Sequence, residues 1–454
     1  MLAASRYLQT TPSPGRNTPR RAVPTRWSFC HALPIVGDVP PSSFPGPRIP
    51  VNGFAELAHA AAVAKAVRPD VALALATLVD VEGSSYRQPG ARLLVDTEGR
   101  ILAGAVSGGC LEADVAARAA DVWTSGRATT LTYDLRTDLE TIWGFGAACD
   151  GVAHIQLEPL PDFSWMEEAE LIRKSRHGGA LVMLIRTGES KDVRLLVEGG
   201  TDTTHPAVIK KVSGDTLTEQ ETAAIVELVR TADRTGLPFA HQLPGDVGSV
   251  FVEPLSAPIA LHIVGAGRGA ELFARIAHTM GWSVTVLDHR PALLEGIQLP
   301  TGVARQGVSA TEGPAGALAA LPHDGRSAVA LLTHVFDVDC AWLTAALPLP
   351  VGYVGVLGSR ARGAQLLEAV EASLASSGTP LTERMRRKLH APIGLDLGGE
   401  DPASIALAAV SEIEAVMHAR PGGFLRERQS PIHTRTPSPR LLNQPIDSEE
   451  PGAA

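Results

Sequence analysis

The sequence predicts an α/β protein, and three observations support this prediction. The apolar run 261–264 leads through a glycine-rich turn into an amphipathic helix, and the next apolar strand ends at Asp288. Strand and helix patterns also alternate upstream of this unit. The composition is 44% hydrophobic but only 4% aromatic, which suits layers packed through small side chains. We therefore expect an N-terminal α/β domain and a C-terminal Rossmann-like, doubly wound domain.

Shifts in composition divide the 454 residues into five segments. Residues 1–50 form a basic, proline-rich tail, and residues 420–454 are rich in proline and serine, so both are expected to be disordered. The prolines also argue against an amphipathic targeting helix in the first segment. Between the tails we expect an N-terminal domain over 51–160, a middle α/β segment over 161–255 and the Rossmann-like domain over 256–419.

The N-terminal domain should begin with a helix over residues 54–67. A second helix is expected over residues 111–124. Apolar runs predict its strands, which cover residues 71–79, 92–95, 101–106 and 152–157.

The middle segment repeats this alternation, with strands expected over residues 180–185 and 193–197 and a helix running through Val229. The phrase Leu-Glu-Pro-Leu at 157–160 has an echo in Val-Glu-Pro-Leu at 252–255. Each phrase closes an α/β segment, which suggests an internal duplication.

The C-terminal domain carries a dinucleotide-binding pattern. Gly265 allows a tight turn, and Gly267 would let the backbone approach a pyrophosphate at the start of the following helix, where unpaired N–H groups attract anions. Asp288 follows about twenty residues later, where an acid can hold a ribose hydroxyl. NAD(P) is therefore a candidate cofactor.

A strand expected over residues 328–332 is followed by His334, at the edge where open α/β sheets bind ligands. His334, Asp337, Asp339 and Cys340 could form a metal cluster. The favoured interpretation is that Asp339 caps a helix over 340–347.

The next strand, expected over residues 351–357, leads into a glycine-serine turn at the start of another helix. Ser359 and Arg360 follow it, and a guanidinium group binds phosphate through paired hydrogen bonds. We predict a second anion site here, with a capped surface helix as the alternative.

Two glycine-rich turns of the N-terminal domain each contain a cysteine. Ser107, Gly108, Gly109 and Cys110 precede a helix whose dipole favours a reactive thiolate, although a buried structural cysteine would also fit. Cys149 lies in the second turn. The two thiols suggest a site for a soft ligand or for sulfur transfer. A zinc site would need more ligands than these two turns offer. A serine-hydrolase site is also disfavoured, because the turn at Ser107 lacks the first glycine of the motif that holds the nucleophilic serine.

Several classes of protein are disfavoured by composition. The net charge of −9 argues against general nucleic-acid binding, which needs a basic surface. No apolar run approaches the roughly 20 residues of a membrane span. The four cysteines form no C-x-x-C pair, so reduced thiols and a cytoplasmic location are expected.

A series of motifs, taken in order, resembles one family. They are GSS at 83–85, PGA at 89–91, SGGCLE at 107–112, the CDG loop at 149–151 that leads to EPL at 158–160, VGAGRGA at 264–270, VTVLDHRP at 284–291, TH at 333–334, GYVGVLGSRAR at 352–362 and HAPIGLDLGGEDPASIALAAVSEI at 390–413. On these motifs the chain resembles the XdhC/CoxI family of xanthine dehydrogenase accessory factors over residues 54–416.

The resemblance implies an accessory factor rather than an enzyme. Such a protein binds molybdenum cofactor (molybdopterin), protects it, supports its sulfuration with a cysteine desulfurase and inserts it into an apo molybdenum hydroxylase; a homo-oligomer is compatible with this role. Cys110 and Cys149 would then contact molybdenum or relay sulfur. One departure is Asp150, which stands where family members often have glycine, so the client hydroxylase stays undefined.

The alternative function is an NAD(P)-dependent oxidoreductase. It would use the same glycines and Asp288, with His334 as the proton-transfer residue. No catalytic lysine or tyrosine pattern accompanies His334.

Overall fold

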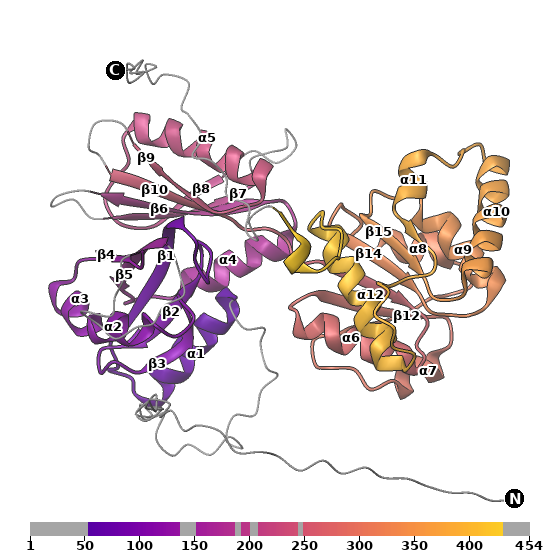
Figure 1. The fold of residues 1–454 in the computed structure, drawn as a ribbon, viewed down its shortest axis with the longest axis horizontal. Helices are drawn as coiled ribbons and strands as arrows, with labels where there is room; N and C mark the ends of the chain where they lie inside the picture. The colour runs from indigo at the N-terminus through magenta and orange to yellow at the C-terminus, as the bar shows by residue number, and fades with distance from the viewer. Residues whose placement is uncertain (1–52, 137–150, 187–191, 200–207, 244–247, 430–454) are drawn as a thin grey trace, which may run out of the picture. The chain divides into compact units, whose positions relative to one another are not determined.

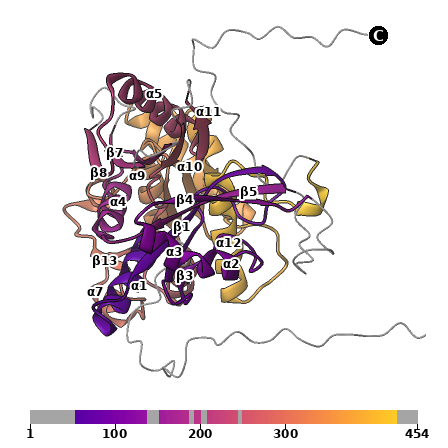
Figure 2. The same ribbon diagram turned by 90° about the vertical axis from the view of Figure 1, so that its left-hand side faces the viewer.

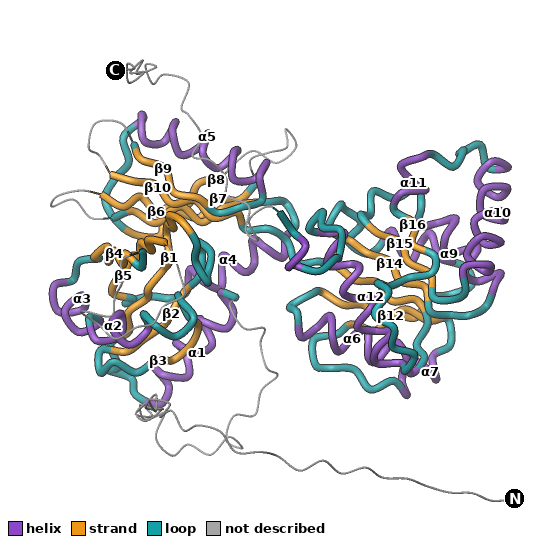
Figure 3. Tube along the Cα trace, in the orientation of Figure 1, coloured by secondary structure: helices purple, strands orange, loops and turns teal. Residues whose placement is uncertain are grey.

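The computed structural model describes residues 53–136, 151–186, 192–199, 208–243 and 248–429. The expectations for residues 1–50, for residues 430–454 and for Cys149 lie outside these ranges, whereas Leu425–Glu427, within the tail predicted over 420–454, form a short 3-10 helix. Figures 1 and 3 show a mixed α/β chain whose described part contains two antiparallel sheets and one parallel sheet. The α/β class and the Rossmann-like C-terminal domain are confirmed. No helix in the described part is long and apolar enough to cross a membrane.

The first sheet has five strands in the order β3-β2-β1-β5-β4. Its strands are β1 (Leu73–Gly83), β2 (Arg92–Asp96), β3 (Ile101–Gly104), β4 (Thr129–Asp134) and β5 (Gly151–Pro159). Its helices are α1 (Phe54–Val67), α2 (Glu112–Ala117) and α3 (Ala119–Ser125). The helix predicted over 111–124 is present but is interrupted at Arg118, whose amide bonds the Val115 carbonyl and tightens the turn between α2 and α3.

The second sheet has the order β8-β7-β6-β10-β9. Its strands are β6 (Gly179–Arg186), β7 (Val193–Glu198), β8 (Val208–Ser213), β9 (Phe239–Gln242) and β10 (Gly248–Pro254). Its helices are α4 (Ser164–Ser175) and α5 (Glu219–Thr235). A reciprocal pair of hydrogen bonds between Thr218 and Glu221 fixes the start of α5.

The two sheets are repeats of one unit, which confirms the suggested duplication. Each strand of the first sheet has a counterpart in the second, in the same spatial order. The registers also correspond, since Ala74 lies opposite Pro159 and Ala180 lies opposite Pro254. One face of the first sheet packs on α2 and α3, and one face of the second packs on α5, as Figures 1 and 2 show. The remaining apolar surfaces meet α1 and α4 in a shared core.

Two buried ion pairs join the repeats reciprocally. Arg92 in β2 pairs with Glu253 in β10, and its counterpart Arg194 in β7 pairs with Glu158 in β5. Each glutamate comes from one of the Glu-Pro-Leu phrases. The repeated phrase therefore marks the acid through which each repeat contacts the other.

The third sheet is parallel, with the order β13-β12-β11-β14-β15-β16. Its strands are β11 (Ala260–Val264), β12 (Ser283–Asp288), β13 (Ala304–Gly307), β14 (Ser327–Leu331), β15 (Tyr353–Val356) and β16 (Leu389–His390). Its helices are α6 (Arg268–Thr279), α7 (Pro291–Gly296), α8 (Gly313–Ala319), α9 (Phe336–Ala346), α10 (Arg360–Ser376), α11 (Glu383–Arg387) and α12 (Pro402–Met417).

Helices cover both faces of the parallel sheet. Residues of α6 and α12 share one core with the sheet, and residues of α8, α9 and α10 share the other. The strand order reverses between β11 and β14, so the segments that follow these strands diverge and leave a crevice at the carboxyl edge. This edge carries the sequence-predicted residues of the C-terminal domain.

Candidate functional site

The turn that contains Cys110 is organised by a buried carboxylate. Glu112 accepts hydrogen bonds from the backbone N–H groups of Val106 (3.1 Å) and Ser107 (2.7 Å), and from the Ser107 hydroxyl (2.5 Å). The Ser107 oxygen in turn accepts from the amides of Gly109, Cys110 and Leu111, each at 3.1 Å. Because its oxygen is fully engaged, Ser107 shapes the turn.

The outer rim of this turn is exposed. Gly108 and Gly109 are exposed and Cys110 is partly exposed, with its Sγ 3.5 Å from the Ser107 oxygen. Gly109 has φ +110°, a conformation that favours glycine. The exposed Tyr86 ring lies over Gly108, where an added Cβ would sit 3.4 Å from ring carbons. The turn thus presents two glycines and a thiol beside an aromatic ring.

The helix after this turn is shorter than expected. It begins at Glu112 and spans six residues, so its dipole offers little to the Cys110 thiol. Reactivity at Cys110 would depend on the exposure of the thiol and on its immediate neighbours.

At the carboxyl edge of the parallel sheet, Gly265 and Asp288 line one cavity of about 470 Å³. Thr333 and the helix residue Trp342 also line it. Gly265 has φ +109°, and a Cβ there would lie 3.1 Å from the Leu332 carbonyl carbon. Glycine is therefore required at this position, because the segments that follow β11 and β14 approach each other closely at the crevice.

Gly267 differs from Gly265, because an added Cβ would meet nothing within 4 Å. Its φ of −82° and ψ of 175° suit any residue. Gly267 lines a neighbouring cavity of about 690 Å³ together with Arg268, Leu293 and Pro402. The open space at the start of α6 is what backbone approach to a phosphate would need.

We expect Gly267→Val to leave the thermal midpoint close to that of the wild type and to weaken nucleotide binding by roughly tenfold, because the side chain enters the phosphate approach. Gly265→Ala should instead lower stability by about 1–3 kcal/mol through backbone strain. Calorimetric melting and titration with NADPH or NADH measure both effects. If the Gly267→Val variant folds and binds the nucleotide as tightly as the wild type, the glycine turn has a structural role only.

Asp288 holds the glycine turn in place. Its carboxylate, 1% exposed, accepts from the Ala266 amide (2.7 Å) and from Arg290 at Nη2 (2.8 Å) and Nε (2.9 Å). Burial acts to raise the pKa of Asp288, but these hydrogen bonds bring the pKa down to about 2. A ribose hydroxyl could reach the carboxylate only by displacing Arg290, so ribose binding by Asp288 stays a prediction.

His334 follows β14 with a positive φ of 60°, and it is exposed. This conformation is uncommon for a residue with a side chain and occurs often at functional sites. His334 does not line either cavity described above. A role in cofactor contact stays a prediction.

Ser359 and Arg360 lie after β15, next but one to β11 in the sheet. The Ser359 hydroxyl accepts from the Arg362 amide (3.2 Å) and caps α10, while Arg360 is exposed. Both fall outside the lining of the two cavities. Phosphate contact by this pair stays a prediction.

The helix cap predicted for Asp339 is wrong. Helix α9 begins at Phe336, so Asp339 lies inside its first turns and is fully buried. It accepts from the Thr333 hydroxyl (2.5 Å) and pairs with Arg362 of α10 (2.8 Å). This aspartate joins two helices behind the carboxyl edge.

Among the described residues, no three His, Cys, Asp or Glu side chains lie close enough together to hold a metal ion. The alternative cluster of His334, Asp337, Asp339 and Cys340 is therefore not formed. Burial, and then the charge of Asp337, raise the pKa of Cys340 and favour its neutral thiol.

Three residues at these sites were missed in the sequence. Glu112 stands five residues after Ser107, whereas the capping-box rule looks for an acid three residues on. Arg290 could have been found as a cation two residues after Asp288. Tyr86 gave no signal, because its contact with Gly108 is tertiary.

Comparisons with known proteins match both halves of the chain. The model for the XdhC and CoxI family matches residues 66–134, and the model for the XdhC Rossmann domain matches residues 261–413. A Bacillus subtilis protein, named as a probable subunit of xanthine dehydrogenase, is 29% identical over 340 residues, covering 75% of this chain and 91% of that protein.

Two further relatives are more distant. The uncharacterized protein YqeB of Escherichia coli is 27% identical over 188 residues, covering 41% of this chain and 32% of that protein. A crystal structure described as a xanthine dehydrogenase from Bacillus halodurans has a TM-score of 0.60 at 24% identity, covering 80% of this chain and 96% of that one. The structural likeness supports the fold.

Proposed function

Because the chain belongs to the XdhC and CoxI family, we propose that it matures a molybdenum hydroxylase of the xanthine dehydrogenase type. In this proposal it binds molybdenum cofactor as cargo, protects it, supports its sulfuration with a cysteine desulfurase and inserts it into the apo-hydroxylase. The protein itself catalyses no turnover of the hydroxylase substrate.

The observation that supports the proposal most is the rim of the Cys110 turn. Hydrogen bonds to the buried Glu112 and Ser107 side chains hold the backbone of the turn. Gly108, Gly109 and a partly exposed thiol remain at the surface. A thiolate is a good ligand for a soft metal and a good acceptor of sulfur. The rim therefore suits transient contact with a metal-bound cargo that must be released again.

Reconstitution of an apo-hydroxylase tests this proposal. The apo-hydroxylase would be incubated with molybdenum cofactor, a cysteine desulfurase and cysteine, with and without this chain. We expect hydroxylase activity to rise substantially only when the chain is present. Equal activation without the chain would contradict a maturation role.

We expect Arg360 to bind the phosphate group of the cofactor. We expect Arg360→Ala to weaken binding of molybdopterin by up to about 1.5–3 kcal/mol, the range of a hydrogen bond to a charged group. Fluorescence titration measures the affinity. The matched control is Arg275→Ala, which removes an exposed arginine of a different helix, α6. An equal loss for dephosphorylated pterin would show that Arg360 does not contact the phosphate.

The second candidate function is an NAD(P)-dependent oxidoreductase. The open space at Gly267 and the adjacent cavities favour a nucleotide. Against this function, the Asp288 carboxylate already bonds Ala266 and Arg290. Dinucleotide binding to the Rossmann-like domain would also be compatible with an accessory role.

A further inference from the structure

The end of strand β12 presents a cation to solvent where the sequence predicted a ribose-binding acid. The Asp288 carboxylate is 1% exposed, whereas the Arg290 side chain is 45% exposed and the His289 side chain is 57% exposed. A ligand at this edge of the sheet therefore meets a guanidinium and an imidazole before it meets the carboxylate. In dinucleotide-binding folds, residues at this position contact the ribose that carries the adenine.

Arg290 keeps hydrogen-bond donors available although it pairs with Asp288. Its Nε and Nη2 atoms donate to the carboxylate at 2.9 Å and 2.8 Å, which uses one edge of the planar group. Its Nη1 atom bonds no acceptor within the described ranges, and it is not one of the buried atoms. The Nη1 side of the guanidinium is therefore open to an anion.

This ion pair lies between two cavities. Asp288 lines the cavity of about 470 Å³, which has mostly apolar walls that include Trp342. Ala266, whose amide donates to Asp288, lines the cavity of about 690 Å³ together with Arg268 at the start of α6. The Asp288–Arg290 pair thus separates an apolar space that suits an aromatic base from a helix start that suits a phosphate.

The acids around Arg290 do not cancel its attraction for an anion. Asp288 is ionised at neutral pH, since its pKa is about 2, but its oxygens are buried and already shared with Arg290 and the Ala266 amide. Asp337, on the opposite wall, follows β14, and strand β11 separates β14 from β12. The exposed Arg268 adds positive charge on the side of α6.

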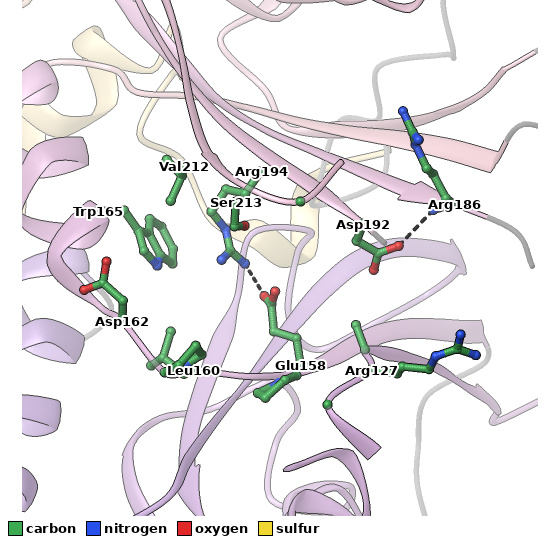
Figure 4. A pocket seen from close by; sticks show the side chains of 15 residues that line it. Arg127, Glu158, Leu160, Asp162, Trp165, Arg186, Asp192, Arg194, Val212 and Ser213 are labelled. Atoms are coloured by element: carbon green, nitrogen blue, oxygen red, sulfur yellow. Dashed lines mark hydrogen bonds and ion pairs between the residues drawn. The ribbon is translucent and has the colours of Figure 1, made fainter. Parts of the chain in front are cut away.

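The cavity that both repeats line, about 360 Å³ in volume and shown in Figure 4, provides a contrast. There Arg194 pairs with Glu158, and Arg186 pairs with Glu221. Both arginine side chains are largely buried, so neither presents free donors to a ligand as Arg290 does. The end of β12 is therefore the better place for recognition of an anion.

We propose that the Rossmann-like domain binds an adenosine nucleotide phosphorylated at its 2′ hydroxyl, and that Arg290 and His289 contact this 2′ phosphate. The phosphate accepts from the Nη1 side of Arg290 and from the His289 ring, while the base enters the apolar cavity. An unmodified 2′ hydroxyl would need the Asp288 oxygens, which Arg290 and Ala266 already occupy. An acid at this position usually selects the unphosphorylated ribose, and the exposed arginine reverses that preference.

This site and the Cys110 turn belong to different domains. Nucleotide binding at β12 neither requires the proposed maturation role nor excludes it.

Calorimetric titration of the full-length chain tests the preference with adenosine 2′,5′-bisphosphate and adenosine 5′-monophosphate, which differ only in the 2′ phosphate. We expect the bisphosphate to bind about 10- to 100-fold more tightly, the effect of hydrogen bonds to a charged group. Adenosine 5′-diphosphate carries its second phosphate elsewhere and controls for added charge alone. If neither 5′-monophosphate nor 2′,5′-bisphosphate binds, or if the 2′ phosphate gives no advantage over both controls, the proposal is wrong.

Two variants locate the site. Arg290→Gln removes the guanidinium charge and should bring the affinities for the bisphosphate and the monophosphate to within about threefold of each other. Monophosphate binding should change little, because the freed Asp288 can accept from the ribose. Ala310→Trp fills the apolar cavity from an exposed position on its wall and should abolish binding of both probes. The matched control is Arg275→Gln, an exposed arginine of α6 outside both cavity linings.

Equal weakening of both probes by Arg290→Gln would assign this arginine to the structure of the turn and overturn its contact with the 2′ phosphate. Unchanged binding to Ala310→Trp would place the nucleotide elsewhere and overturn the site. A thermal melt of each variant establishes that it is folded before affinities are compared. The comparison of probes on the wild type decides the preference even if a variant does not fold.

Discussion

Cys110→Ser should abolish activation of the client hydroxylase while leaving the fold intact. The thiol is partly exposed on the rim of its turn, and its amide bonds Ser107 whatever the side chain. Serine is close in volume, so the thermal midpoint should stay near that of the wild type. Only metal contact or sulfur transfer would be lost. Reconstitution of the apo-hydroxylase and a melting curve measure the two effects.

The same exchange at two other cysteines provides comparison. Cys340→Ser should activate the client normally, because burial and Asp337 favour the neutral thiol there. Cys149→Ser is expected from the sequence to resemble Cys110→Ser. Normal activation by both Cys110→Ser and Cys149→Ser would refute a thiol role and leave cargo binding to backbone and arginine contacts.

Glu112→Ala should both destabilise the N-terminal domain and stop activation. Its buried carboxylate accepts from two backbone amides at 3.1 Å and 2.7 Å and from the Ser107 hydroxyl. Removing it leaves these donors without a partner, at a cost of about 1–3 kcal/mol, and more for groups bonded to a charge. Denaturant unfolding measures the loss, and the activation assay follows.

Glu112→Gln separates the two effects. The amide oxygen can still accept from the backbone, so much of the stability should return, while the charge that holds the Ser107 hydroxyl is lost. The exposed Glu98 supplies a control, since Glu98→Ala should change stability little. If Glu112→Ala is as stable and as active as the wild type, the buried carboxylate does not organise the turn.

The Rossmann-like domain was predicted from sequence with better success than the two sheets before it. Its central strands are buried apolar runs, and the turn around Gly265 has a local signature. Four strands of these sheets were not predicted: β4, β8, β9 and β10. Strands β4 and β8 are edge strands with largely exposed residues, whereas β10 is a buried inner strand whose apolar residues were not recognised. Their antiparallel pairing depends on contacts between distant residues, which periodicity does not encode.

The candidate sites show the same division. Gly265, Gly267 and Cys110 were singled out as candidates because turns and helix starts have short-range rules. Asp339 was misassigned, because its contacts with Thr333 and Arg362 arise only when α9 and α10 pack together.

The small molecules released from the purified chain test the central claim most directly. The protein would be isolated from cells that synthesise molybdenum cofactor, denatured, and its bound molecules identified by mass spectrometry. A maturation factor predicts a molybdopterin derivative in amounts comparable to the protein. A stoichiometric nicotinamide dinucleotide with no pterin would contradict the claim and favour the oxidoreductase.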